Sequence, residues 1–177
     1  MISERETVFK TPYFSVVAKR LARMPEGDPF YSLSLGDYVT VVALASSDEV
    51  VLVRQFRPAV EAYTLELPAG HVDPGDTPEQ AARAELAEET GFNAARVVPL
   101  GCLKPDTGRL GNRMWVYFAD GLTPLPGHSR EAGVEVVMRS RAALAADLAE
   151  GRFDHALHVA ALMLAVQAGR LALPVEK

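Results

Sequence analysis

Cysteine is nearly absent from this 177-residue chain. Cys102 is the only one, so an intramolecular disulfide framework is excluded, and with it the small secreted folds that depend on one. A lone thiol fits a reducing compartment, and we expect the protein to be cytoplasmic. Since no basic cluster adjoins Cys102 in the sequence, we expect it to pack in a strand and to have no reactive role.

Long apolar runs and an excess of positive charge are also missing. The longest apolar run, Val159 to Val166, is far shorter than the roughly 20 residues of a membrane helix. No stretch near the N-terminus combines basic residues with an apolar segment of signal length. The net charge of −5 and the pI near 5.4 argue against nucleic acid, because no basic stripe could neutralise phosphates. We expect a soluble protein with neither a membrane nor nucleic acid as its partner.

Strand and helix signals alternate along a chain whose length suits one domain. Together they predict an α/β (α+β) fold with helices on the faces of a mixed sheet. The predicted strands are 14–22, 29–35, 38–45, 50–55, 65–70, 97–103, 114–119 and 134–139. The predicted helices are 78–90, 141–150 and 155–168.

One helix is framed by clear start and stop signals. Thr77 suits the N-cap, Pro78 the first helical position, and Gln80 completes a capping box. Gly91 is the residue expected just past the helix end. A Pro/Gly turn at residues 73–76 precedes this helix, so strand, tight loop and helix form one compact unit.

Three glutamates on this helix indicate its chemistry. Glu85, Glu88 and Glu89 are spaced i, i+3 and i+4, which places their carboxylates on one helix face. Like charges at this spacing destabilise a helix unless something compensates them, and hard divalent ions such as Mg²⁺ bind carboxylate oxygens and substrate phosphates. Without the surrounding motif, a solvated acidic helix face would be the simpler interpretation.

The segment Gly70–Phe92 resembles the Nudix box, with the pattern G-x5-E-x7-R-E-U-x-E-E-x-G-U, where U is aliphatic or aromatic. Two positions depart from it: Asp76 replaces the first glutamate, and Ala84 replaces the arginine that orients the glutamates in the family. Arg83 lies one place earlier, rotated by about 100° around the helix. The matching residues are Gly70, Glu85, Leu86, Glu88, Glu89, Gly91 and Phe92.

The sequence before the box is similar to one branch of this family. VVLVRQFR at 50–57 and LELPAG at 65–70 resemble the "vRQyR…ELPAG" run of ADP-ribose and nucleoside-diphosphate-sugar pyrophosphatases. The resemblance implies a Nudix α/β/α sandwich with an N-terminal antiparallel strand extension. This extension, residues 1–45, would pack on the Nudix domain, residues 46–177, and take part in a homodimer interface.

The resemblance also implies the site residues. The Ala69 carbonyl, Glu85 and Glu89 would hold the metal, Mg²⁺ or alternatively Mn²⁺, with Glu88 as a further ligand. Arg57 would contact substrate phosphate, because its planar fork donates two parallel hydrogen bonds to phosphate oxygens. The other predicted substrate contacts are Arg54, Glu66 and Arg109; the predicted catalytic residues are Glu88, Glu89 and Glu131. Arg54 fits equally well as a polar position of an alternating strand.

Two loops leave alternatives open. The loop 104–113, which carries Arg109, is either a lid over a phosphate or sugar or an ordinary exposed loop. It lacks the proline and glutamate that ADP-ribose enzymes typically carry there. The loop 124–133 offers Glu131 as general base, with Glu135 on the next strand as the second candidate, and both also fit ordinary surface acids.

His155 and His158 lie three residues apart on the last predicted helix. We expect them to pack, partly exposed, and not to bind zinc.

The implied function is metal-dependent hydrolysis of the pyrophosphate bond in a nucleoside diphosphate linked to a sugar, either ADP-ribose or another sugar. The products would be a nucleoside monophosphate and a sugar phosphate. LELPAG disfavours a free nucleoside triphosphate or a dinucleotide as substrate. A catalytically weak nucleotide-binding or regulatory protein of the Nudix fold is the alternative that Asp76 and Ala84 keep open.

Overall fold

The computed structural model describes residues 1–24, 26–46, 48–128 and 131–174, and the chain divides into two compact units. The first unit combines Met1–Asp37 with Cys102–Met114, and the second combines Tyr38–Gly101 with Trp115–Lys177. The predicted extension of residues 1–45 therefore includes strand β4 (Tyr38–Leu44), which lies in the second unit. Its role in a dimer stays a prediction.

The first unit contains a three-stranded antiparallel sheet in the order β1-β2-β3. Strands β2 (Ser15–Leu21) and β3 (Phe30–Ser34) confirm two predictions, whereas β1 (Ile2–Lys10) was missed. Most side chains of β1 are exposed on both faces, so the strand has no alternating apolar pattern to reveal it. The loop 104–113 joins this sheet through Leu33, whose N–H donates to the Arg109 carbonyl at 2.7 Å.

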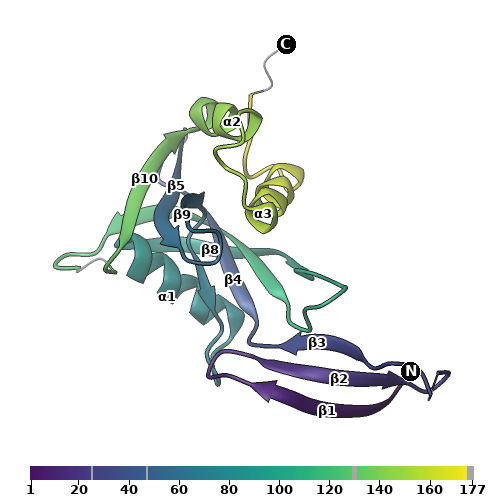
Figure 1. The fold of residues 1–177 in the computed structure, drawn as a ribbon. Coiled ribbons are helices and arrows are strands. Elements are labelled where there is room, and N and C mark those ends of the chain that lie inside the picture. Colours follow the sequence, from purple (N-terminus) through teal and green to yellow (C-terminus); the bar gives the residue numbers. More distant parts are fainter. Residues whose placement is uncertain (25, 47, 129–130, 175–177) are drawn as a thin grey trace. The chain divides into compact units, whose positions relative to one another are not determined.

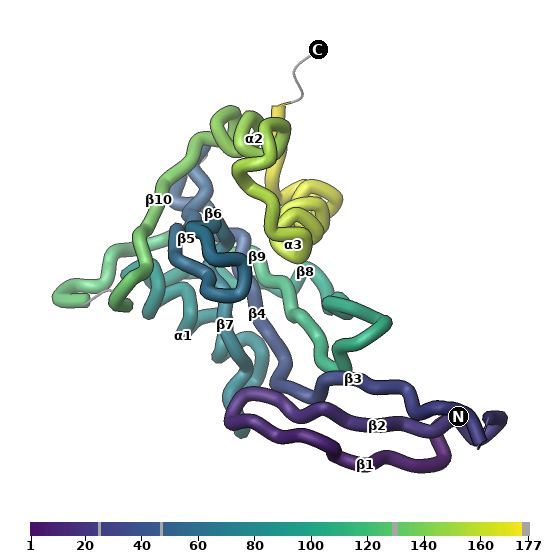
Figure 2. The backbone as a smooth tube through the Cα atoms, in the orientation of Figure 1, coloured from purple at the N-terminus to yellow at the C-terminus, as the bar shows by residue number. Residues whose placement is uncertain are grey.

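The second unit is built on a seven-stranded sheet with helices on both faces (Figures 1 and 2). Its main path is β10-β5-β4-β9-β8, while β6 pairs with β5 and β7 pairs with β4. In Figure 1, α1 covers one face, and α2 and α3 cover the other. The remaining elements are β5 (Glu49–Arg57), β6 (Ala62–Glu66), β7 (Ala69–His71), α1 (Pro78–Thr90), β8 (Phe92–Leu103), β9 (Met114–Pro124), β10 (Val134–Ser140), α2 (Arg141–Ala149) and α3 (Ala156–Gln167).

The predicted single strand 65–70 is wrong, because the chain forms two short strands there. Strand β6 ends at Glu66 on β5, and β7 begins at Ala69 on β4. Pro68 has no N–H to donate to a ladder, so the strand cannot continue through it and the chain crosses between two partners. This crossing creates the turn on which the candidate site is built.

Helix α1 has the predicted bounds. The Thr77 hydroxyl accepts a hydrogen bond from the Gln80 N–H at 3.3 Å, and the Gln80 side chain accepts one from the Thr77 N–H at 2.9 Å. Gly91 closes the helix in the left-handed conformation, with φ of 74°, which glycine adopts without steric cost. The caps fix which helix turn carries each glutamate.

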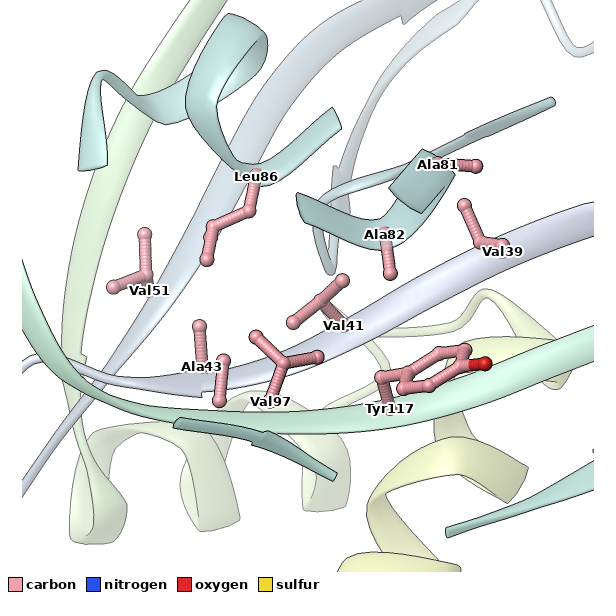
Figure 3. Packing of buried hydrophobic residues seen from close by; sticks show 10 residues of the cluster. Val39, Val41, Ala43, Val51, Ala81, Ala82, Leu86, Val97 and Tyr117 are labelled. Atoms are coloured by element: carbon pink, nitrogen blue, oxygen red, sulfur yellow. The ribbon is translucent and has the colours of Figure 1, made fainter. Parts of the chain in front are cut away.

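The core beneath α1 sets the distance between helix and sheet (Figure 3). Val39, Val41 and Ala43 alternate along β4, so their side chains share one face, and α1 places Ala82 and Leu86 against that face. All five are at most 1% exposed. Small alanines let the helix approach the sheet closely, which brings its glutamates to the β6–β7 turn.

The predicted α+β fold with a mixed sheet and an N-terminal antiparallel sheet is confirmed. Among the described residues, no helix combines the length and the apolar character needed to cross a bilayer.

Candidate active site at the β6–β7 turn

The turn between β6 and β7 is held against β4 by its backbone. The Pro68 carbonyl accepts the Val41 N–H at 2.9 Å and the Thr40 hydroxyl at 3.3 Å. Ala69 then pairs with Thr40 as the first residue of β7. A backbone fixed in this way can present its groups to a ligand without further ordering.

Glu89 joins α1 to this turn. Its side chain is 4% exposed, and its carboxylate accepts the Ala69 N–H at 2.9 Å. Burial raises the pKa of Glu89 to about 7, and the charges of Glu85 and Glu131 act in the same direction, whereas the Ala69 N–H and Arg57 oppose the shift. Glu89 is therefore a buried acid that lacks full compensation by the protein.

Glu85 lies directly against Gly70. A Cβ atom added to Gly70 would overlap the Glu85 carboxylate, so any other residue at this position would displace the Glu85 side chain. Burial raises the pKa of Glu85 to about 7, with further contributions from the charges of Glu88, Glu131 and Asp73, while a hydrogen bond from the His71 backbone opposes the shift. The first glycine of the box thus makes room for a carboxylate.

The donor set fits a hard divalent cation. Glu85 and Glu89 are held at adjacent residues of β7, and Glu88 is exposed one position before Glu89. Like charges gathered in a partly buried place are costly, and a cation would remove that cost. That Glu85, Glu88, Glu89 and the Ala69 carbonyl bind a metal stays a prediction, and their arrangement is compatible with it.

Arg57 and Glu66 form a bidentate ion pair beside this site. Arg57 donates from Nε to Glu66 Oε1 at 2.8 Å and from Nη2 to Oε2 at 2.7 Å, and the Thr64 hydroxyl donates to Oε1 at 2.6 Å. Burial by itself would raise the pKa of Glu66, but the hydrogen bonds from Arg57 and Thr64 outweigh it and hold the pKa at about 2. The Glu66 hydrogen bond is the main cause of the raised pKa of Arg57.

This ion pair fixes the position of the Arg57 guanidinium. The charges of Glu89 and Glu131 both raise the pKa of Arg57, so the guanidinium lies within electrostatic range of the predicted metal ligands. Glu66 is 1% exposed and accepts bonds from protein groups on both oxygens, an arrangement that suits holding Arg57. The predicted substrate contacts of both residues stay predictions.

Arg54 and Glu135 form an exposed ion pair. Arg54 Nη1 lies 3.3 Å from Glu135 Oε2, and its guanidinium carbon lies 4.3 Å from the centre of the Tyr63 ring. Glu135, the alternative candidate for the general base, is therefore already paired with Arg54. The charge of Glu131, by contrast, raises the pKa of both Glu85 and Glu89. Of the two candidate bases, Glu131 is the one favoured by these interactions.

Arg109 belongs to the first unit. Its N–H donates to the Asp106 carboxylate at 3.2 Å, and its carbonyl accepts the Leu33 N–H. Its predicted contact with substrate stays a prediction.

Arg83 does not take the place of the box arginine that Ala84 replaces. It donates to the Glu79 carboxylate at 2.9 and 3.1 Å and to the Ala94 carbonyl at 3.2 Å. Both Ala84 and Asp76 are exposed.

A second group of potential metal ligands consists of Glu66, His155 and His158. One atom each from Glu66, His155 and His158 lie within 4.8 Å of one another, so these side chains are close enough to hold an ion. The prediction that the two histidines are partly exposed is wrong for His158, which is 3% exposed and accepts the Leu67 N–H on Nδ1 at 3.1 Å. Burial lowers the pKa of His158 to about 3, with the His155 charge acting in the same direction.

Two supporting residues were missed from the sequence. Thr64 lies two residues before Glu66, and the period of a strand places both side chains on one face, so this contact was accessible to pattern analysis. His158 is separated from Leu67 by 91 positions, and no local signal connects them.

The site geometry agrees with the comparisons with known proteins. A family model described as the NUDIX domain matches residues 35–155, more than half of the chain. This chain belongs to the Nudix family. The predicted family is confirmed, and the segment Gly70–Phe92 is its Nudix box.

Two curated Nudix relatives match over part of their length. The ADP-sugar pyrophosphatase of Mus musculus is 48% identical over 58 residues, which are 32% of this chain and 27% of that protein. The ADP-ribose pyrophosphatase of Bacillus subtilis (strain 168) is 32% identical over 87 residues, 49% of this chain and 47% of that protein. The matched segments therefore span less than half of either relative.

A solved structure matches over nearly the whole chain. The crystal structure of an ADP compounds hydrolase covers 97% of this chain and 96% of its own, with a TM-score of 0.76 and 26% identity. The likeness extends beyond the Nudix box to both ends of the fold.

Replacing Gly70 with alanine tests the packing of Glu85. The added Cβ should push the Glu85 carboxylate away from the turn, and we expect Mn²⁺ affinity, measured by calorimetry, to fall by about 10–100-fold, as is common when a metal ligand loses its orientation. The matched control is Gly101→Ala, whose Cβ would meet only the end of the Leu164 side chain at 3.2 Å. Unchanged affinity in a folded Gly70→Ala variant would show that Glu85 is not a ligand.

The raised pKa values of Glu85 and Glu89 predict how stability depends on pH without metal. Between about pH 4.5 and 7 the unfolded chain has lost these protons while the folded protein keeps them, so the glutamates lower the free energy of unfolding as pH rises. The lowered pKa of His158 acts in the opposite sense between about pH 3 and 6.5.

Comparing wild type with a Glu85→Gln/Glu89→Gln variant isolates the effect of the two glutamates on stability, because His158 is present in both proteins and its contribution cancels. In chelator, we expect the variant to become increasingly more stable than wild type from about pH 5 to 7.5 in denaturant titrations. Mg²⁺ should reverse this order at the higher pH. A difference independent of pH would contradict the raised pKa values of Glu85 and Glu89.

Proposed function

We propose that this Nudix protein hydrolyses the pyrophosphate bond of a nucleoside diphosphate linked to a sugar. Water would enter across that bond, and the products would be a nucleoside monophosphate and a sugar phosphate. ADP-ribose is the first candidate, and another nucleotide sugar is the second. Nudix hydrolases generally depend on a divalent metal, and here we propose Mg²⁺, with Mn²⁺ as a substitute.

The observation that carries this proposal is the arrangement of Glu85 and Glu89 against the β6–β7 turn. The buried Glu89 accepts the Ala69 N–H, the half-buried Glu85 lies against Gly70, both have raised pKa values, and Arg57 lies within electrostatic range of Glu89. Negative ligands for a cation beside a fixed guanidinium are what a pyrophosphate needs, because its own charge must be neutralised before water can attack.

The substrate class is supported by the names of similar proteins. An ADP-sugar pyrophosphatase is similar to this chain over 58 residues and an ADP-ribose pyrophosphatase over 87 residues, and an ADP compounds hydrolase shares the fold over 97% of the chain.

The residues of the site would have separate roles in metal binding, phosphate binding and proton transfer. Ala69, Glu85 and Glu89 would hold the metal, with Glu88 at the exposed edge. When bound, the ion would polarise the phosphoryl oxygens and acidify water. Arg57, oriented by Glu66, would donate hydrogen bonds to the phosphate and stabilise charge that develops on it.

Glu131 would act as the general base. It is exposed, so its carboxylate is available to accept a proton from water, and its charge acts on Glu85, Glu89 and Arg57. Arg54, which pairs with Glu135, would contribute at most to the edge of the substrate site.

We also propose that the protein is a cytoplasmic homodimer whose N-terminal strands take part in the interface. The sheet of the first unit carries exposed apolar side chains at Val8, Phe9, Phe30 and Tyr31. Exposed apolar groups on a small sheet are typical of a surface that binds another chain.

The second candidate function is nucleotide binding without efficient hydrolysis. It is favoured by the loss of the box arginine, since Ala84 replaces it and Arg83 bonds elsewhere. The retained glutamates favour the hydrolase, because a protein that only binds has less use for repelling carboxylates.

The proposal is tested by replacing Glu89 with glutamine and assaying a substrate panel. The panel contains ADP-ribose, several UDP- and GDP-sugars, dinucleotides and nucleoside triphosphates, with Mg²⁺, Mn²⁺ or chelator, and product phosphates are detected by a coupled phosphatase. We expect metal-dependent cleavage of a nucleotide sugar, and a loss in the variant larger than the roughly 10–100-fold caused by changes around a metal's ligands.

Glu79→Gln is the matched control, because Glu79 is an exposed glutamate of the same helix that pairs with Arg83. It should retain activity. Near-normal turnover in a folded Glu89→Gln variant would remove Glu89 from the site. If wild type hydrolyses no compound of the panel while a nucleotide still raises its melting temperature, nucleotide binding without hydrolysis becomes the favoured function.

A further inference from the structure

The four residues from Glu66 to Ala69 are each held by a different element. Glu66 is bound by Arg57 of β5, the Pro68 carbonyl accepts from β4, and the Ala69 N–H donates to Glu89 of α1. The remaining residue, Leu67, is completely buried and donates its N–H to His158 of α3 at 3.1 Å. The turn is thus fixed from both faces of the sheet.

The bond from Leu67 meets a need created by the turn. Strand β6 ends at Glu66, so the next N–H has left the ladder with β5 while it is still inside the protein. A buried N–H without an acceptor is strongly unfavourable. His158 supplies the acceptor from a helix that is far away in sequence.

This bond also determines where the proton of His158 resides. Because Nδ1 accepts, the neutral ring carries its proton on Nε2, which is then a donor. His155 stacks on the ring with centroids 3.9 Å apart and planes inclined by 19°, which restrains the ring orientation.

The same hydrogen bonds make the Glu66–His155–His158 group a poor metal site. His158 uses Nδ1 for Leu67, and a protonated Nε2 has no lone pair for an ion. Both oxygens of Glu66 accept from Arg57, and one accepts from Thr64 as well. Glu66 and His158 are therefore committed to hydrogen bonds with protein groups, whereas the buried Nδ1 of His155 has no partner among the described residues.

We propose that His158 is a positioning residue. By accepting the Leu67 N–H, it fixes the Glu66–Ala69 turn. It thereby also fixes the direction of the Ala69 carbonyl and the position of the Arg57–Glu66 ion pair. The inference rests on the proposed function, in which that carbonyl binds metal. Ala69 is two residues from Leu67, with the rigid Pro68 between them, so a displacement of Leu67 is transmitted to Ala69. Groups that orient metal ligands typically change metal affinity or activity by about 10–100-fold when they are removed.

The test compares side chains that place an acceptor at different points. His158→Asn puts an oxygen where Nδ1 lies, whereas His158→Gln places it near the position of Nε2, and His158→Leu has no acceptor. Mn²⁺ binding without substrate is measured by calorimetry, and the exchange rate of the Leu67 amide by NMR. We expect the Gln and Leu variants to bind Mn²⁺ about 10–100-fold more weakly with faster Leu67 exchange, and Asn to stay close to wild type.

Ala161→Gly is the control for a weakened helix, since Ala161 is buried in α3 and makes no contact through a side-chain acceptor. It should leave Mn²⁺ affinity unchanged. Nitrogen NMR of wild-type His158 provides a readout that needs no variant, and it should show the proton on Nε2. A proton on Nδ1, wild-type Mn²⁺ affinity in the Gln or Leu variant, or a folded Asn variant as weak as Gln would each overturn the proposal.

The proposed function can fail separately from this inference. If wild type binds Mn²⁺ but cleaves no substrate of the panel, hydrolysis is wrong, and the order of Mn²⁺ affinities among the variants still decides the role of His158.

Discussion

The site depends on the contact between helix α1 and the β6–β7 turn. Glu89 accepts the Ala69 N–H, and Glu85 occupies the space that Gly70 leaves open, so two carboxylates are held at two consecutive residues. Folding energy from the apolar core under α1 brings these acids together despite their repulsion. The raised pKa of each glutamate is the consequence, and a cation is the natural means of relieving it.

The glutamates around the turn lie in two different electrostatic environments. The buried Glu66 has a lowered pKa because Arg57 and Thr64 bind it, whereas the half-buried Glu85 and the buried Glu89 have raised pKa values. One acid is thus committed to orienting a guanidinium, and two are left for a ligand. In the proposed function, this division would place an anion-binding group beside a cation-binding group, which is the arrangement required for the chemistry of a pyrophosphate.

The sequence predicted the parts of the site that depend on local spacing. The capping box of Thr77 predicted the start of α1 and Gly91 its end, and the i, i+3, i+4 spacing placed Glu85 and Glu89 on one face. The split of LELPAG into two strands was missed because the short run 65–70 predicts a single strand, whereas the chain crosses from β5 to β4 at Pro68. The bond from Leu67 to His158 could not be predicted, since it arises only when α3 packs on the sheet.

The central claim is that the metal binds at the β6–β7 turn and not at the histidine group behind it. Crystals grown with Mn²⁺ would decide this, because anomalous scattering locates the ion directly. The account predicts a peak bound by Glu85, Glu89 and the Ala69 carbonyl at the short distances of oxygen ligands, about 2.0–2.6 Å. A peak among Glu66, His155 and His158, with none at the turn, would contradict it.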